Sequence, residues 1–476
     1  MNTLLLRPTD VLFFRDGRPM SGSLAGHTAA WPLPDVTNHA LHAALHRADL
    51  DQHTSEKLHH HRRRRSGQYS EARDRKFGSL LTAGPFPVDA SGRWFFPRPK
   101  DAQIECSAAV TLQPVGAPAT GAASDAWHGS SLPSPLAYAV ANTRPPAKDA
   151  GGEPWISAEA FAVYLQGKSS PSSSHFLRDE SIADKEANFG IAIDPDTQTA
   201  GQGTAARQIY TAHYLRLREG YRLGLLAKAE DKDFRHPQHG CDLVAALLHG
   251  HPGQIVVGGQ QRVCTAELSR LPALPLPRGL AGGFQQITRA GVHSWLVKWV
   301  LLSPAIWPEI PAGTSKRGTA TRFHPGGWLP NWICPQTGAV LLRAVDEAER
   351  RRRRQLNAAG EGYQTDAGNA GEIPARLVAA IVPKPLVVTG WALPSPLDPG
   401  RTAGGGAKST HLAVPAGAVY YFTAPSAEAA VKLAAALNWH GSAHGVDIAN
   451  RRSTLLGEKG YGLGVCGTWQ FIGDVA

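Results

Sequence analysis

Catalytic chemistry in proteins needs ionisable or nucleophilic side chains at set spacings, and this 476-residue sequence offers few such arrangements. It contains no HExxH, no GxSxG, no His-Asp doublet and no carboxylates clustered at metal-binding spacing. Residues 404–409 (GGGAKS) approach a phosphate-binding loop, but Ala407 stands where the Walker pattern requires glycine before the lysine. We therefore expect no catalytic residues, no bound metal and no cofactor.

The twenty histidines keep metal-independent RNA cleavage open, because an imidazole titrates near neutral pH and can act as general acid or base. Residues 59–61 are three consecutive histidines in an expected loop, and such a run alone gives awkward metal geometry, so a solvated patch is favoured. His39, His42 and His46 follow helical spacing. They would form either a solvated or half-buried helix face or a set of phosphate contacts.

The formal net charge of +10 favours a polyanionic partner, either nucleic acid or an anionic membrane surface. The membrane alternative finds little support. The apolar N-terminal run lacks a basic start and is broken by Arg7 and Asp10, and the most apolar stretch, 295–307, is too short to span a bilayer. The five scattered cysteines form no CxxC pair, which favours a reducing cytoplasm over a disulfide framework or a zinc site.

The elements that must position the basic and aromatic residues follow one pattern twice. In the first half we expect a strand at 3–8, a helix at 38–47, a β-hairpin at 208–217 and 221–226, a helix at 241–249 and a strand at 254–267. In the second half we expect strands at 292–302, 376–388, 418–422 and 461–472, and helices at 340–354 and 426–438. The first order is β-α-β-β-α-β, the ferredoxin-like split βαβ unit.

The sequence therefore predicts an α+β fold of two tandem ferredoxin-like (RRM-like) domains, 1–275 and 276–476. Residues 51–78 and 112–154 are predicted to be long loop insertions or partly disordered segments in the first domain, because they lack apolar periodicity. The second domain is predicted to end in a glycine-rich loop at 460–464.

Several local motifs occur in a fixed order along residues 4–470. They are residues 7–19 (RPTDVLFFRDGRP), 31–34 (WPLP), 95–101 (FFPRPKD), 190–194 (GIAID), 257–262 (VGGQQR), 389–391 (TGW), 414–422 (VPAGAVYYF) and 460–464 (GYGLG). In this order the motifs resemble the third subunit of Cmr complexes, which belongs to the RAMP superfamily of CRISPR proteins. Gln260 departs from the family pattern, which has an acidic residue there, and the two insertions depart from it as well.

The resemblance implies a non-catalytic subunit of a type III-B CRISPR RNA-targeting effector, a cytoplasmic ribonucleoprotein of antiviral defence. Such a subunit grips the repeat-derived 5′ handle of the crRNA and joins the large, polymerase-like Cmr subunit to the first backbone subunit. It meets target RNA indirectly and has no membrane partner. Two alternatives stay open: a standalone RAMP endoribonuclease that processes precursor crRNA, and a general RNA-binding protein without a CRISPR role.

Single-stranded RNA is held through its phosphates and by stacking of its bases, and three candidate sites suit that task. Arg15 and Arg18 flank an Asp-Gly turn and could bind phosphates bidentately, although a plain turn explains them too. Thr37 and Asn38 would cap the first helix, whose exposed N–H groups attract phosphate, and capping alone explains them equally well.

The glycine-rich loop would let RNA approach the backbone closely, with Lys459 for a phosphate and Tyr461 for a base. Glycines that relieve crowding at a strand start are the alternative. The remaining predicted RNA contacts are His39, Arg262, Lys408 and His411. The arginine runs 62–65 and 350–354 would add attraction that does not depend on RNA sequence.

Overall fold

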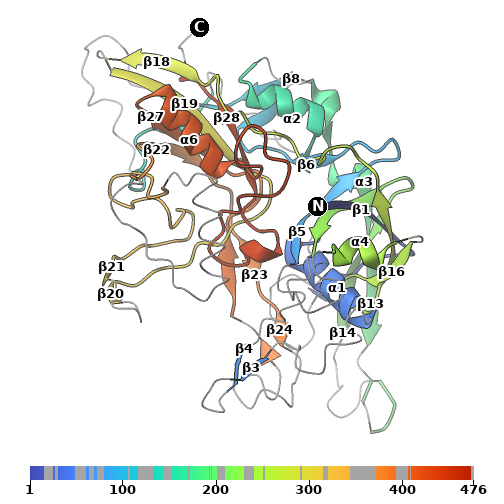
Figure 1. Cartoon of the computed structure of the whole chain (residues 1–476). Coiled ribbons are helices and arrows are strands. Elements are labelled where there is room, and N and C mark those ends of the chain that lie inside the picture. The colour runs from blue at the N-terminus through green and yellow to red at the C-terminus, as the bar shows by residue number, and fades with distance from the viewer. Residues whose placement is uncertain are drawn as a thin grey trace.

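The computed structural model describes residues 1–14, 25–26, 31–48, 61–63, 69–71, 80–105, 108–115, 132–142, 153–168, 172–191, 193–194, 196–200, 209–229, 241–249, 252–289, 292–314, 320–343, 371–392, 406–407 and 409–472. In this part of the chain the two largest sheets have five strands each, and their neighbouring strands run antiparallel. Figure 1 shows the first, built from the N-terminal half, at the right of the view and the second at the upper left.

The first sheet has the strand order β16-β17-β1-β15-β5. Its elements are β1 (Asn2–Pro8), α1 (Pro34–Arg47), β5 (Leu81–Val88), β15 (Arg222–Lys228), α4 (Leu243–Leu247), β16 (Gly253–Val256) and β17 (Val263–Ser269). The succession β-α-β-β-α-β is present in this half, formed in chain order by β1, α1, β5, β15, α4 and β17. Strand residues alternate between faces, so Leu4 and Leu6 pack with Leu41 and Leu45 of α1, while Leu5 faces the opposite side.

Three details of the first half differ from the prediction. The strand at 209–217 pairs with β13 and not with β15, so the predicted hairpin is wrong. The single strand expected at 254–267 is two strands, β16 and β17, because Gly258 adopts a φ of +81° and the chain reverses over 257–262. Helix α1 begins at Pro34 and not at Asn38, since a proline fits the first helical position, where no intrahelical N–H bond is made.

The second sheet has the order β18-β19-β27-β22, and β28 also pairs with β19. Its elements are β18 (Gln285–Arg289), β19 (Val292–Leu301), β22 (Arg376–Ile381), β27 (Val419–Ala424), α6 (Ala427–Leu437) and β28 (Gly464–Thr468). Ser426 caps α6 as predicted, because its hydroxyl accepts a bond of 3.1 Å from the Ala429 N–H. Leu433 and Leu437 of α6 pack on Trp299 in one core.

Two predictions for the second half are corrected. Residues 340–343 are extended and not helical, since Val340 bridges Ile333 and Arg343 bridges Glu372; the rest of the helix predicted at 340–354 lies outside the described residues. The strand expected at 376–388 is divided between β22 and β23 (Leu386–Val388), and β23 pairs with β26 (His411–Ala413) in a separate two-stranded sheet.

The described parts of the predicted insertion 112–154 pack on the second half of the chain. The Ile472 N–H donates to Pro114 O at 3.0 Å, and the Tyr138 N–H donates to Val378 O at 3.0 Å. The Tyr138 ring meets Phe471 edge to face, with centroids 5.0 Å apart. This stretch is therefore partly a connector between the halves and not simply a surface loop.

The remaining elements are smaller. They are β2 (Ala25–Gly26), β3 (His61–Arg63), β4 (Tyr69–Glu71), β6 (Phe95–Pro97), β7 (Ala102–Glu105), β8 (Ala108–Thr111), β9 (Gln113–Pro114), β10 (Val140–Ala141), β11 (Trp155–Ser157), α2 (Ala158–Leu165), a 3-10 turn at Ser173–His175, β12 (Phe176–Leu177), α3 (Asp179–Ile182), β13 (Ala183–Ile191), β14 (Ile209–Leu217), β20 (Gly313–Thr314), β21 (Ala320–Thr321), β24 (Trp391–Ala392), β25 (Gly406–Ala407) and the 3-10 turn η5 (Gly457–Lys459).

A buried polar cluster joins the two halves beneath α2. Asp101 is 0% exposed and Lys298 is 2% exposed, and the Lys298 Nζ lies 3.4 Å from Asp101 Oδ2. The hydroxyls of Tyr164 and Tyr421 donate to the same carboxylate at 2.6 and 3.0 Å, and the ammonium lies over the Tyr164 ring. Burial lowers the pKa of Lys298, and the charge of Asp101 opposes that shift. Each buried charge is therefore stabilised by the opposite charge beside it.

We predict that Lys298→Met lowers the free energy of unfolding by about 3–5 kcal/mol, because it leaves the Asp101 carboxylate buried without its cation. Urea denaturation of the purified chain measures this. Lys432→Met is the matched control: Lys432 is exposed and pairs with Glu428 one helical turn away, so its loss should cost less than about 1 kcal/mol. Equal losses in the two variants would contradict the coupling of the halves through this cluster.

Candidate nucleic-acid interface

The glycine-rich loop at the end of the chain docks on the N-terminal half. Gly460 has a φ of +95°, and a Cβ added there would lie 2.7 Å from the Thr82 carbonyl oxygen and 3.4 Å from the Pro34 side chain. A residue with a side chain would thus be strained and would also collide with β5. The glycine brings residues 457–461 against the start of α1, more than 400 positions away in the sequence.

Tyr461 anchors this loop. Its hydroxyl donates a hydrogen bond of 2.7 Å to Asp35 Oδ1, in the first turn of α1, and its ring is 0% exposed. Burial, helped by the charge of Asp35, raises the pKa of Tyr461 far above its usual value, so the phenol stays a hydrogen-bond donor. A ring this deeply buried cannot stack on a base, which corrects the role predicted for Tyr461.

Thr37 and Asn38 are also buried and do not cap α1, because the helix begins at Pro34. The Thr37 hydroxyl donates to Pro34 O at 3.1 Å. The Asn38 amide donates to Thr82 Oγ1 at 3.0 Å and so attaches α1 to β5. Both side chains serve the packing of the interface, and the predicted attraction of phosphate by a capped helix end at these residues does not fit the structure.

Lys459 and His39 meet at the surface of this junction. The Lys459 ammonium donates to His39 Nε2 at 2.8 Å, and the His39 side chain is exposed. A lysine ammonium carries donors only, so the imidazole nitrogen is the acceptor in this contact. Of the ten predicted residues, these two are brought together at the surface, one from each end of the chain.

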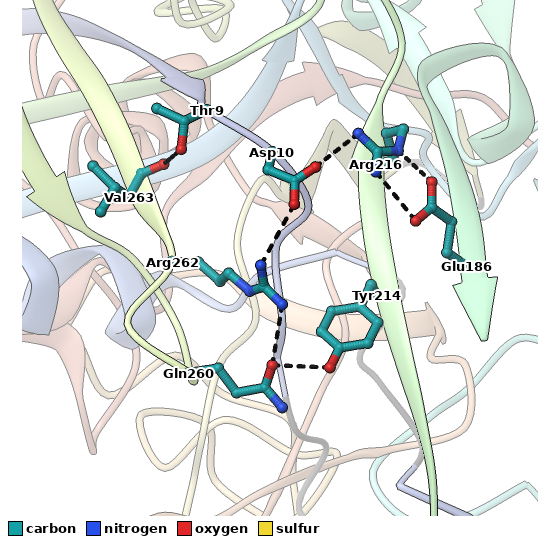
Figure 2. Close-up of polar contacts among 8 residues, drawn as sticks. All are labelled: Thr9, Asp10, Glu186, Tyr214, Arg216, Gln260, Arg262 and Val263. Carbon is teal, nitrogen blue, oxygen red and sulfur yellow. Dashed lines mark hydrogen bonds and ion pairs between the residues drawn. The ribbon is translucent and has the colours of Figure 1, made fainter. Parts of the chain in front are cut away.

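Arg262 belongs to a different group of contacts (Figure 2). Its guanidinium lies 3.5 Å from Asp10 Oδ2, donates to Gln260 Oε1 at 3.2 Å and sits 5.0 Å from the centre of the Tyr214 ring. The Tyr214 hydroxyl donates to the same Gln260 oxygen at 2.9 Å. Asp10 also pairs with Arg216, whose Nη1 lies 2.9 Å from Asp10 Oδ1. The network fastens the turn at 257–262 to the ends of β1 and β14, a structural task for Arg262.

The other predicted residues are placed as follows. His411 begins β26, opposite Val388 of β23, and this pair of strands shares a small core with Tyr461. Arg15, Arg18 and Lys408 lie outside the described residues, as does the arginine run 350–354. Asp35 was missed by the sequence reasoning, although an acidic residue directly after a proline is a typical first-turn signal.

Among the residues that the structure describes, no three His, Cys, Asp or Glu side chains lie so that they could hold a metal ion. Among the same residues, no helix has the length and apolarity needed to cross a membrane.

A family model for the CRISPR-associated protein Cas_Cmr3 matches residues 4–469, nearly the whole sequence. The chain therefore belongs to the Cas_Cmr3 family of CRISPR-associated proteins, and the resemblance to the third subunit of Cmr complexes is confirmed. No curated protein matches the sequence.

Solved CRISPR complexes contain chains of distantly similar structure. A chain of the type III-B Cmr-beta complex bound to cognate target RNA and AMPPnP aligns with a TM-score of 0.37 and 12% identity, over 88% of this chain and 86% of the other. A chain of the Csm3–Csm4 subcomplex of a type III-A interference complex aligns with a TM-score of 0.36 and 10% identity, over 88% and 92%. Similarities this low assign no ligand or partner.

We predict that Gly460→Ala destabilises the chain more than Gly92→Ala does. Both glycines have a positive φ (+95° and +83°), so both variants lose about 1–2 kcal/mol to backbone strain. An added Cβ at Gly92 meets nothing within 4 Å, whereas at Gly460 it meets Thr82 O. Overpacking should add about 1–3 kcal/mol at Gly460. Thermal unfolding of both variants measures the difference, and equal losses would show that the loop is not tightly docked.

Proposed function

We propose that this chain is a non-catalytic subunit of a type III-B CRISPR effector complex, in which it grips the 5′ repeat-derived handle of the crRNA. Its partners in this proposal are the large Cmr subunit and the first backbone subunit. Membership of the Cas_Cmr3 family and the net charge of +10 support the proposal. The observation that carries it is the surface at which Lys459 and His39 meet.

This surface suits the backbone of a single-stranded RNA. The Lys459 ammonium is a compact cation with three donors, and its contact to His39 uses one of them. A phosphate oxygen can accept a hydrogen bond from an ammonium, and an exposed imidazole can meet a neighbouring phosphate or a 2′-hydroxyl. Arg15, Arg18, Lys408 and His411 stay predicted RNA contacts. Arg262 stays one as well, in addition to fastening the turn at 257–262.

We also infer that the chain is built from two tandem ferredoxin-like RAMP domains, 1–275 and 276–476. The β-α-β-β-α-β order around the first sheet supports the first domain. In the second, β28-β19-β27-β22 repeats the spatial order β17-β1-β15-β5, and α6 precedes the closing strand as α4 does in the first half. The handle-binding surface then lies where the second domain's last loop meets the first domain's first helix.

The test compares the affinity for a crRNA that carries its 5′ handle with the affinity for one whose handle is scrambled, with and without the other Cmr subunits. We expect tighter binding to the natural handle, most clearly in the complex. Lys459→Gln should weaken binding and reduce the slope of log affinity against log salt by about 0.7, the contribution of one phosphate contact to a single strand.

Lys432→Gln is the control, because Lys432 is an exposed lysine on α6 that the proposal does not use. It should leave the affinity and the salt slope unchanged. Equal affinity for both RNAs in every setting would reduce the chain to a basic scaffold. An unchanged salt slope in Lys459→Gln would remove this surface from the proposal while leaving the handle preference to be explained by other residues.

The alternative of a RAMP endoribonuclease rests on His39, an exposed imidazole beside a lysine. We predict no cleavage when the chain is incubated for long times with repeat RNA in EDTA, resolved on a denaturing gel. Products that appear in EDTA and vanish in His39→Ala would establish the ribonuclease and replace the non-catalytic assignment.

A further inference from the structure

A pocket of about 280 Å³ opens at the buried polar cluster that joins the two halves of the chain. Asp101 and Lys298 both line it, and so do the two tyrosines of the cluster, Tyr164 at the end of α2 and Tyr421 on β27. Its walls therefore come from both halves. The buried ion pair is consequently not sealed inside the protein but faces a space that a small molecule can enter.

The ammonium of Lys298 has hydrogen-bonding capacity that the protein does not use. An ammonium carries three N–H donors. Asp101 Oδ2, at 3.4 Å, is the one acceptor that the described residues supply, and the nitrogen lies 3.5 Å from the centre of the Tyr164 ring. With one donor directed at the carboxylate and one at the ring face, a third remains. A buried donor without an acceptor is costly, so an oxygen atom is expected beside Lys298 in the pocket.

The Asp101 carboxylate is in the opposite state, because donors of the protein surround it. Tyr164 donates to its Oδ1, and Tyr421 and Lys298 donate to its Oδ2. Three donors leave this carboxylate little capacity to attract a cation. The open valence at the floor of the pocket is therefore that of a donor, which selects an acceptor and favours an anion.

The remaining walls continue this donor character. The amide side chains of Gln113, Gln285 and Gln470 line the pocket, and the exposed Lys168, just after α2, lines it as well. No other described residue forms a hydrogen bond or an ion pair with these four side chains. The lining residues include two lysines and one carboxylate, so they carry one more positive than negative charge.

We propose that this pocket binds a small oxyanion, either inorganic phosphate or a short carboxylate, with one oxygen at the Lys298 ammonium and another at Lys168. The volume lies just below the range of roughly 300–1,000 Å³ that sites for larger organic ligands occupy, which fits a small ion better than a nucleotide. Because residues of both halves contact it, the bound anion strengthens the joint between them. The proposal does not depend on the proposed function.

The experiment titrates the full chain, in Tris chloride buffer at constant ionic strength, with inorganic phosphate and separately with acetate. Calorimetry should show saturable binding of at least one of the two anions, and the one that binds names the source of the oxyanion. Lys298→Met should weaken binding roughly 10- to 150-fold, the loss of a buried charge-assisted hydrogen bond. Lys168→Gln should weaken it only about 1.5- to 5-fold, as for an exposed ion pair.

Lys432→Gln is the control, since Lys432 is exposed on α6 and far from this pocket in its contacts, and it should bind as the wild type does. Asp101→Asn supplies a second test, because Lys298→Met is expected to be destabilised. It leaves the buried Lys298 cation without its counter-ion, which an added oxyanion replaces. The anion should therefore raise the unfolding temperature of Asp101→Asn by more than it raises that of the wild type.

Four results would overturn the proposal. They are no saturable binding of either anion, equal stabilisation of Asp101→Asn and the wild type, binding that needs Lys168 but not Lys298, and displacement of the anion by crRNA. The third would show an adventitious ion only, held at the surface. The fourth would assign the pocket to an RNA phosphate. Since handle affinity enters none of the binding constants, a failure here leaves the proposed function untouched.

Discussion

The close approach of the C-terminal glycine-rich loop to the first turn of α1 is the contact on which the candidate site depends. Gly460 permits it, because any side chain would meet the Thr82 carbonyl, and the bond from Tyr461 to Asp35 fixes it. Lys459 reaches His39 because the glycine-rich loop passes close to the first turn of α1. The loop thereby joins the two halves of the chain in one surface, with Lys459 supplied by the C-terminal half and His39 by the N-terminal half.

A second contact explains why the two halves hold a fixed relation. Alternation along β19 sends Trp299 into the core beneath α6 and sends Lys298 to the other face, toward the first half of the chain. There Asp101 receives the ammonium and two tyrosine hydroxyls. A buried pair of this kind contributes little net stability compared with apolar packing, but it penalises any arrangement in which the partners separate. It therefore specifies how the halves meet.

Periodicity predicted the elements well where apolar residues repeat, as along α6 and around Leu41 and Leu45 of α1. It failed where pairing is decided by distant chain segments: β14 pairs with β13, and one predicted strand is broken at Gly258. The same limit applies to the site. Sequence spacing directed attention to Lys459 and the loop beside it, but it could not show that the Tyr461 ring packs in one core with Ile306 and Val388, which are distant in the sequence.

The packing gives different roles to the sequence motifs that carry the family resemblance. Residues 31–34 and part of 95–101 (Pro97, Arg98 and Lys100) line one pocket, while residues 460–464 include the loop that docks on α1. Motifs from distant parts of the chain thus converge at a single junction between the halves. A binding site built from closely packed elements loses little conformational freedom when a flexible strand binds, so less of the binding free energy goes into ordering the protein. This preorganisation is the physical reason to look for the handle here.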